Sequence, residues 1–367
     1  MPSSSPSSNP QPSRRNILKT AAVGAAALAG APTILNAMQN AQKSNVLGSG
    51  RHTYEVVADW PKRPDDKPWG DTHMVQEVAD GRIFICHNGP ESVHVYDADG
   101  KFITAWGDEQ KGHAHGMDLR KEGNEEFLYF APTGLHKVIK TNLKGEKVFE
   151  IGYPKEAKNA KGEPCYKDVT QPDGKVKPAA AFYVPTFIAF APGDDGDFYV
   201  ADGYGSSYVH RYNIKGEYQS TFGGKGNGEG QLDCPHGIYV DTRDAKNPTV
   251  LVADRSNHRL QWFTLDGKFI KIVTDELRDP CHFDQRGSDI LIPDLNGRVT
   301  IFDKDNKLVT HLGDNPDPAK RRNHGVKKEE LVPGQFVTPH GAIWDRAGNI
   351  YVAEWLPYGR VTKLRPV

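Results

Sequence analysis

Five histidines occupy matching places in a set of sequence repeats, each where a predicted strand begins: His73, His115, His236, His282 and His340. Imidazole nitrogens are common ligands of zinc and of other transition metals. Three imidazoles that converge and leave a fourth position open form a catalytic rather than a structural zinc site. A lone histidine in a channel wall is more often held by water and backbone groups. The number of histidines that converge therefore decides between the two roles.

Two turns carry further residues that could do chemistry. Tyr204 lies in "DGYGSS" and Arg255 in "DRSN", both directly after a predicted strand. A tyrosine can transfer protons, and an arginine can offset developing negative charge. Taken singly, each is as consistent with surface packing as with function. We expect the aspartates that begin such turns to accept backbone hydrogen bonds, which is a structural role: Asp202, Asp254 and Asp294.

These residues are positioned by six units that share one hydrophobic pattern. Each unit reads as strand, glycine-bearing turn, strand, turn, strand and a "DGKF"-type hairpin into a fourth strand. Six four-stranded units predict an all-β fold, a six-bladed β-propeller. The stretch "VADRSNHRLQWFTLDGKF" resembles NHL repeats. The sixth unit ends after its third strand, so we expect residues 52–60, "HTYEVVADW", to add its outer strand and close the ring.

Propeller topology indicates which of these residues meet. The start of the innermost strand and the turn between strands two and three lie on the same face of a blade. His115, His236 and His340 come from the second, fourth and sixth units, so they are spaced by a third of a turn and can converge on the axis. This predicts a metal site, with zinc as the first candidate and iron or manganese as alternatives. His73 and His282 are additional candidates, either as fourth and fifth ligands or as proton carriers.

Residues 69–364 resemble peptidyl-α-hydroxyglycine α-amidating lyase, the second catalytic half of peptidylglycine α-amidating monooxygenase. The order and spacing of "DGY", "PHG" and "ADR" carry the resemblance. It implies a six-bladed propeller with three channel histidines on zinc, at His115, His236 and His340. It also implies a catalytic tyrosine at Tyr204 and an adjacent arginine at Arg255.

The chain departs from that family at several positions. Asn88 stands where the family has an arginine, so a cationic partner for a substrate carboxylate is missing there. Gly341 replaces an acidic residue that helps to hold a structural calcium, which leaves calcium in doubt. The family's cysteine pairs near these turns are also replaced, since Gly205 follows Tyr204 and Trp262 stands at a partner position.

The resemblance implies a metal-dependent lyase that cleaves the C–N bond of a peptidyl-α-hydroxyglycine, or of a related hydroxylated amide, to an amide and glyoxylate. Its substrate would be a peptide or a small molecule. Two alternatives stay open: a propeller hydrolase or lactonase, which would need a carboxylate-rich calcium centre, and a non-catalytic NHL-propeller binding protein.

The N-terminal stretch "SRRNILKTAAVGAAALAGAPTILNA" resembles a bacterial twin-arginine signal, with Arg14 and Arg15 before an Ala-rich run. We therefore expect residues 1–42 to be a signal peptide and linker read by the twin-arginine export machinery. Residues 52–367 would form one propeller domain in the periplasm or outside the cell. The run from Ala21 to Leu35 is too short for a stable membrane anchor.

Composition narrows the function classes further. The chain has 46 Lys and Arg against 47 Asp and Glu, without a basic run, which argues against nucleic-acid binding. The cysteines form no C-x-x-C pair and are too few for a disulfide scaffold: Cys86, Cys165, Cys234 and Cys281. We expect the protein to be a monomer.

Overall fold

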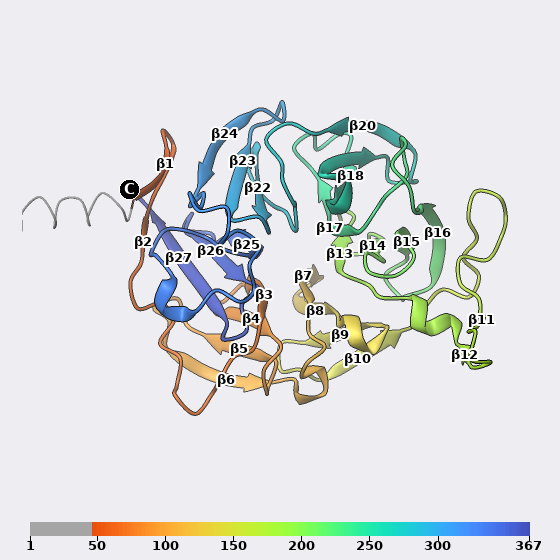
Figure 1. Ribbon diagram of the computed structural model, residues 1–367, viewed down its shortest axis with the longest axis horizontal. Coiled ribbons are helices and arrows are strands. Elements are labelled where there is room, and N and C mark those ends of the chain that lie inside the picture. The colour runs from red at the N-terminus through yellow and green to blue at the C-terminus, as the bar shows by residue number, and fades with distance from the viewer. Residues whose placement is uncertain (1–45) are drawn as a thin grey trace, which may run out of the picture. The chain divides into compact units, whose positions relative to one another are not determined.

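Six antiparallel sheets are arranged around a common centre in the computed structural model, which describes residues 46–367 (Figure 1). The predicted export signal in residues 1–42 lies outside the described residues and stays a prediction. Among residues 46–367, no helix has the length and apolar character needed to cross a membrane.

The first five blades are regular four-stranded sheets. Blade one comprises β3 (Thr72–Glu77), β4 (Ile83–His87), β5 (Val93–Tyr96) and β6 (Phe102–Trp106). Blade two comprises β7 (Gly116–Glu122), β8 (Glu125–Ala131), β9 (Val138–Asn142) and β10 (Lys147–Ile151). Blade three comprises β13 (Phe187–Phe190), β14 (Phe198–Ala201), β15 (Tyr208–Tyr212) and β16 (Tyr218–Gly223). Blade four comprises β17 (Pro235–Asp241), β18 (Thr249–Asp254), β19 (Arg259–Phe263) and β20 (Phe269–Val273). Blade five comprises β21 (Asp284–Arg286), β22 (Asp289–Asp294), β23 (Arg298–Phe302) and β24 (Leu308–Leu312).

Blade six joins the two ends of the described chain. It consists of β25 (Pro339–Trp344), β26 (Ile350–Glu354), β27 (Arg360–Pro366), β2 (His52–Val56) and β1 (Val46–Ser49). Strand β2 pairs antiparallel with β27, and Glu55 lies opposite Arg365. The predicted closure by an N-terminal strand is therefore confirmed. β1 adds a fifth strand that the repeat pattern did not predict.

The core lies between successive blades, where sheet faces pack on each other. Every residue of the middle strands β4, β22 and β26 is buried. Such strands read as continuous apolar runs rather than as alternating ones, because both of their faces are covered. The innermost strands β3, β7, β13, β17 and β25 surround the centre of the ring (Figure 1).

Two long segments are attached to turns of the blades. Residues 153–181 contain the hairpin β11 (Val169–Thr170) and β12 (Val176–Lys177) and most of η3 (Ala179–Phe182). The Tyr166 hydroxyl donates to Asp202 at 2.7 Å and so ties this segment to blade three. Residues 314–335 contain η5 (Lys328–Glu330), and His324 contacts Asp71 beside blade one at 2.6 Å.

Candidate active site

Three imidazoles meet where the inner strands of alternate blades begin. His115 directly precedes β7, while His236 and His340 are the second residues of β17 and β25. Their ring centroids are separated by 4.8 Å (His115 to His236), 4.6 Å (His115 to His340) and 4.7 Å (His236 to His340). All three residues are buried. The structure thus brings the three predicted ligands together in a nearly equilateral triangle.

Each of these rings is oriented by the backbone of the next blade. The Nδ1 atom of His115 lies 3.0 Å from the Thr186 carbonyl oxygen. The equivalent distances are 2.8 Å from His236 to Cys281 and 3.1 Å from His340 to His73. Since a carbonyl only accepts, Nδ1 carries the proton and Nε2 keeps its lone pair. This is the tautomer and orientation that a metal-binding histidine needs.

A glycine follows each of these histidines and allows this contact. A Cβ atom placed on Gly116, Gly237 or Gly341 would lie well under 3.0 Å from the carbonyl oxygen that accepts from the preceding imidazole. The small residue therefore lets adjacent inner strands approach closely. This gives the "HG" pairs in the sequence a physical reason, and it gives Gly341 a role of its own.

The lone pairs of these imidazoles gather in a small volume. The Nε2 atoms of His115 and His340 are 3.1 Å apart, and the Tyr204 hydroxyl lies 3.2 Å from Nε2 of His115 and 2.9 Å from Nε2 of His236. Two nitrogen ligands about 2.0–2.1 Å from a tetrahedral zinc would be roughly 3.3 Å apart. Two unprotonated nitrogens at 3.1 Å repel each other unless a cation lies between them, so the donor set fits a metal ion.

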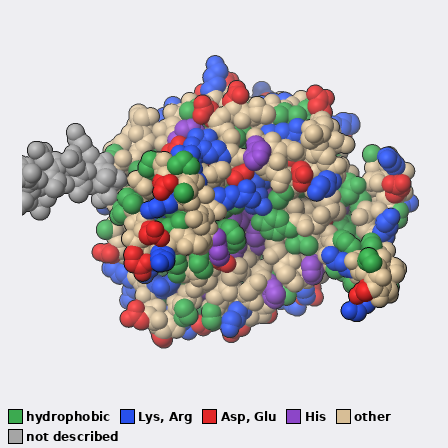
Figure 2. Space-filling view, viewed as in Figure 1, with side chains coloured by type: hydrophobic (Ala, Val, Ile, Leu, Met, Phe, Trp, Pro, Cys, Tyr) green, Lys and Arg blue, Asp and Glu red, His purple; other side chains and the backbone are tan. Residues whose placement is uncertain are grey.

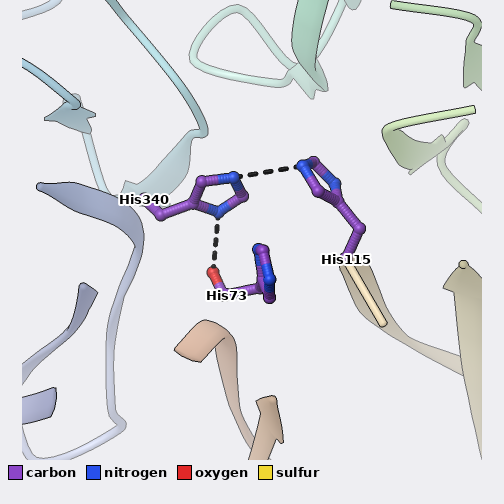
Figure 3. A group of neighbouring side chains, drawn as sticks. All are labelled: His73, His115 and His340. Atoms are coloured by element: carbon purple, nitrogen blue, oxygen red, sulfur yellow. Dashed lines mark hydrogen bonds between the residues drawn. The ribbon is translucent and has the colours of Figure 1, made fainter. Parts of the chain in front are cut away.

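His73 adds a fourth imidazole at the edge of the triangle. Its ring centroid is 5.0 Å from that of His115 and 4.7 Å from that of His340. Within the described residues, His73, His115 and His340 form the group whose ligand atoms all lie within 4.8 Å of one another (Figure 3). Nδ1 of His73 is buried without a partner, and its Nε2 contacts Asn88 at 3.0 Å. It lacks the carbonyl contact that orients the other three rings.

His282 is not brought to this centre. Its Nε2 faces Asp118 at 3.6 Å, in a separate cavity of about 320 Å³ on the far side of Phe187. The buried Phe187 ring packs on His282 with a centroid distance of 4.9 Å and on His236 at 5.4 Å. The proposal of His282 as an additional ligand is therefore not supported, because this aromatic ring stands between it and the triangle.

Burial keeps the imidazoles neutral. It lowers the pKa of His115 to about 3, and it lowers the pKa values of His73, His236 and His340 well below the ordinary value. For His236 the positive charge of Arg255 adds to this effect. Neutral imidazoles are the form that binds metals.

Tyr204 reaches the triangle from the turn after β14. The turn is held by Asp202, whose carboxylate accepts the backbone N–H groups of Val184 at 2.6 Å and Ser206 at 2.7 Å. Asp202 therefore holds the turn through backbone hydrogen bonds, which is the structural role predicted for it. The Tyr204 residue is 43% exposed, but its hydroxyl end is enclosed by imidazoles. Burial raises the pKa of Tyr204 to about 12, while the positive charge of Arg255 acts to lower it.

Arg255 begins η4 (Arg255–Asn257), and its guanidinium carbon lies 5.3 Å from the centroid of the Tyr204 ring. Its Nη2 is 3.3 Å from Sγ of Cys234, and its Nη1 is 4.0 Å from Sγ of Cys281. Burial acts to lower the pKa of Arg255, but its interactions with Tyr204 and the two thiols raise it more, and the pKa is raised overall. Among the described residues, no carboxylate forms an ion pair with it.

A cavity of about 430 Å³ opens above the triangle. It is lined by His73, Asn88, Ala114, His115, Thr133, Tyr204, Arg255, Leu295, Arg322, His340 and Trp355. Figure 2 shows histidine and basic side chains together near the middle of this face.

The sequence pattern singled out neither Arg322 nor Leu295, because a loop and a turn residue become neighbours only when the ring closes. The two thiols beside Arg255 were missed for the same reason.

Sequence relatives of this chain include an NHL-repeat protein and an amidating lyase. No protein-family model matches the chain. The human NHL repeat-containing protein 3 is 24% identical over 256 residues, which cover 66% of this chain and 67% of that protein. The peptidyl-α-hydroxyglycine α-amidating lyase 1 of Drosophila melanogaster is 28% identical over 280 residues, which cover 71% of this chain. They cover 46% of the fly protein, so the match spans less than half of its length.

The chain is a six-bladed β-propeller with NHL-repeat relatives. Solved structures agree with this architecture. A virginiamycin B lyase of Staphylococcus aureus has a TM-score of 0.54 and 13% identity, over 86% of this chain and 99% of that one. A gluconolactonase of Xanthomonas campestris has a TM-score of 0.56 and 13% identity, over 88% of this chain and 95% of that one. Identity this low shows the fold alone.

Proposed function

We propose that this propeller is a metal-dependent lyase that cleaves the C–N bond of a peptidyl-α-hydroxyglycine, or of a smaller hydroxylated acylglycine, to an amide and glyoxylate. One observation carries the proposal. Three imidazoles with carbonyl-bound Nδ1 atoms converge beside a cavity that two of them line, and the Tyr204 hydroxyl lies 2.9 Å and 3.2 Å from two of their Nε2 atoms. The similarity to the fly amidating lyase supports the choice of reaction.

His115, His236 and His340 would hold the metal through Nε2, with His73 beside them as a candidate fourth ligand. Zinc suits three neutral imidazoles best, and iron or manganese are alternatives. Bound there, such an ion would act as a Lewis acid and make a substrate hydroxyl more acidic. Phe187 covers the opposite side, so the open side faces Tyr204 and the cavity.

The side chains of the site would manage the proton and the charge. The pKa of Tyr204 is raised to about 12 by burial, so its ionised form would depend on a cation held by the three Nε2 atoms together with Arg255. The substrate hydroxyl would then lose its proton to the oxygen of Tyr204, and its C–O bond would become the carbonyl of glyoxylate. The electrons of the C–N bond leave with nitrogen, which takes a proton from Tyr204 or water and becomes the amide. Arg255, above the Tyr204 ring, stabilises the tyrosinate before the transfer and the negative charge that develops during it.

The test is glyoxylate release from an α-hydroxyglycine-terminated peptide and from a small α-hydroxylated acylglycine, using protein whose metal content has been measured. We expect release that depends on bound metal and stops when a chelator removes it. A fully metallated protein that releases no glyoxylate from either substrate would refute the proposal.

Export forms a separate part of the proposal. It rests on Arg14 and Arg15 in the sequence and would deliver the folded protein to the periplasm or outside the cell. Replacing both arginines with lysine keeps the charge but should leave the precursor in the cytoplasm. Normal delivery of that variant, measured by cell fractionation, would remove this part of the proposal.

A further inference from the structure

The cavity above the histidines is built to receive an anion. Its lining includes two guanidinium groups, those of Arg255 and Arg322, and contains no aspartate or glutamate among the described residues. The lining imidazoles are neutral, because burial lowers their pKa values. A carboxylate entering this cavity would meet both guanidinium groups, and the acidic partner of Arg322, Asp279, does not line the cavity.

The two guanidinium groups are not equivalent. Arg255 is buried against the Tyr204 ring and two thiols, so its charge is directed at the tyrosine. Arg322 stands at the rim, with its side chain 52% exposed. Only Nη1 of Arg322 has a hydrogen-bond acceptor among the described residues, the buried carboxylate of Asp279 at 3.0 Å. The remaining N–H groups of this guanidinium are free to bind a planar carboxylate.

The backbone at Arg322 is held in an unusual conformation. Its φ of 55° lies in the left-handed region that normally favours glycine or asparagine. The strained position is maintained by a hydrogen bond from the Arg322 N–H to the Val337 carbonyl at 2.8 Å. Together with the Asp279 ion pair, this fixes where the side chain projects.

We propose that Arg322 is the residue that binds the substrate carboxylate and so selects acylglycine-type acids over neutral amides. This inference rests on the proposed lyase function. Asn88, which also lines the cavity, is neutral and already contacts His73, so it supplies no charge. Leu295 and Trp355 offer apolar surface for the acyl part of such a substrate.

Binding of unreactive probes tests the assignment without relying on turnover. The probes are N-benzoylglycine and N-benzoylglycinamide, which differ only in carboxylate against neutral amide, titrated calorimetrically into protein of known metal content. Wild-type protein should bind the acid more tightly than the amide. Arg322→Ala should reduce this preference by about tenfold or more, the usual worth of a hydrogen bond to a charged group.

Three further variants make the result specific. Arg322→Gly removes the guanidinium while relieving the left-handed backbone, so it should lose the preference although the loop is not strained. Arg322→Lys should keep part of it. Lys328→Ala removes a positive charge from the same segment, but Lys328 does not line the cavity, so the preference should be unchanged.

The outcomes separate this inference from the lyase proposal. If Arg322→Ala and Arg322→Gly bind both probes as wild type does, or if wild type shows no preference for the acid, the inference is overturned even when glyoxylate is released. If wild type releases no glyoxylate but the preference is lost in both Arg322 variants, the lyase proposal fails while Arg322 stands as a carboxylate-binding residue.

Discussion

At the residue scale, the decisive feature is the proton on Nδ1 of three histidines. Each is bound to a carbonyl of the next blade, which leaves three Nε2 lone pairs on the axis. His73 lies close to His115 and His340 but lacks this contact, and His282 points at Asp118. The chemistry therefore depends on hydrogen-bond partners more than on the mere presence of histidine.

Metal content should distinguish these histidines. Changing His115, His236 or His340 to Ala should each remove most of the bound metal, since a three-ligand site loses one third of its donors. His282→Ala is the matched control and should keep wild-type metal content, because its imidazole lies beyond Phe187. Elemental analysis of the purified variants measures this. If the His236 variant keeps its full metal content while the His73 variant loses metal, the ligands are instead His73, His115 and His340.

Tyr204→Phe should leave the metal in place and lower glyoxylate release by roughly two to four orders of magnitude, because only the proton-accepting hydroxyl is lost. Arg255→Ala should also retain metal while reducing kcat at least as much as it weakens binding. Steady-state kinetics on metal-matched samples checks both variants. Unchanged turnover in Tyr204→Phe would keep a lyase but exclude this tyrosine as its base.

At the scale of elements, the site depends on close contact between neighbouring inner strands. The contact exists because glycine follows each of the three histidines and leaves room for the next blade's carbonyl. The same strand starts carry Pro235 and Pro339, and proline is tolerated at the first residue of a strand. Strand geometry and imidazole orientation are thus set by the same few residues.

Gly237→Ala tests this dependence. A Cβ there would lie 2.5 Å from the Cys281 carbonyl oxygen that accepts a hydrogen bond from His236. Strand β17 and the start of blade five would therefore have to move apart. We expect bound metal to fall severalfold while far-UV circular dichroism still reports a β-propeller. Gly152→Ala is the control, since a Cβ there meets no atom within 4 Å. Equal metal in both variants would show that the close approach does not matter.

At the scale of the whole molecule, closure of the ring joins the blades, and buried polar networks hold the attached segments to them. His210 is one such group: its Nε2 lies 2.6 Å from the Tyr166 hydroxyl, which also donates to Asp202, and its Nδ1 lies 2.8 Å from Thr221. Burial lowers the pKa of His210 from 6.5 to about 3. The group lies away from the histidine triangle and reports on folding alone.

This lowered pKa predicts how acid affects stability. Below pH 6.5 the unfolded chain binds a proton on His210 that the folded protein does not bind until about pH 3, so acidification favours unfolding. The wild type should therefore lose about 2 kcal/mol more than His210→Gln between pH 7 and pH 5. Denaturant titrations at the two pH values measure this difference. Parallel stability losses in the two proteins would contradict the predicted protonation.

The sequence by itself determined the six repeats, the closing strand and the residues that start each inner strand, because alternation, turns and hydrophobic runs are local patterns. It also pointed to Tyr204 and Arg255 through the spacing of short motifs, within a resemblance to a known lyase family. The tertiary structure decided which histidines share a centre, how their Nδ1 atoms are held, and that Phe187 separates His282 from the rest. It also brought Arg322 to the rim of the cavity. These features arise from contacts between blades far apart in the chain, and such contacts form only when the ring closes.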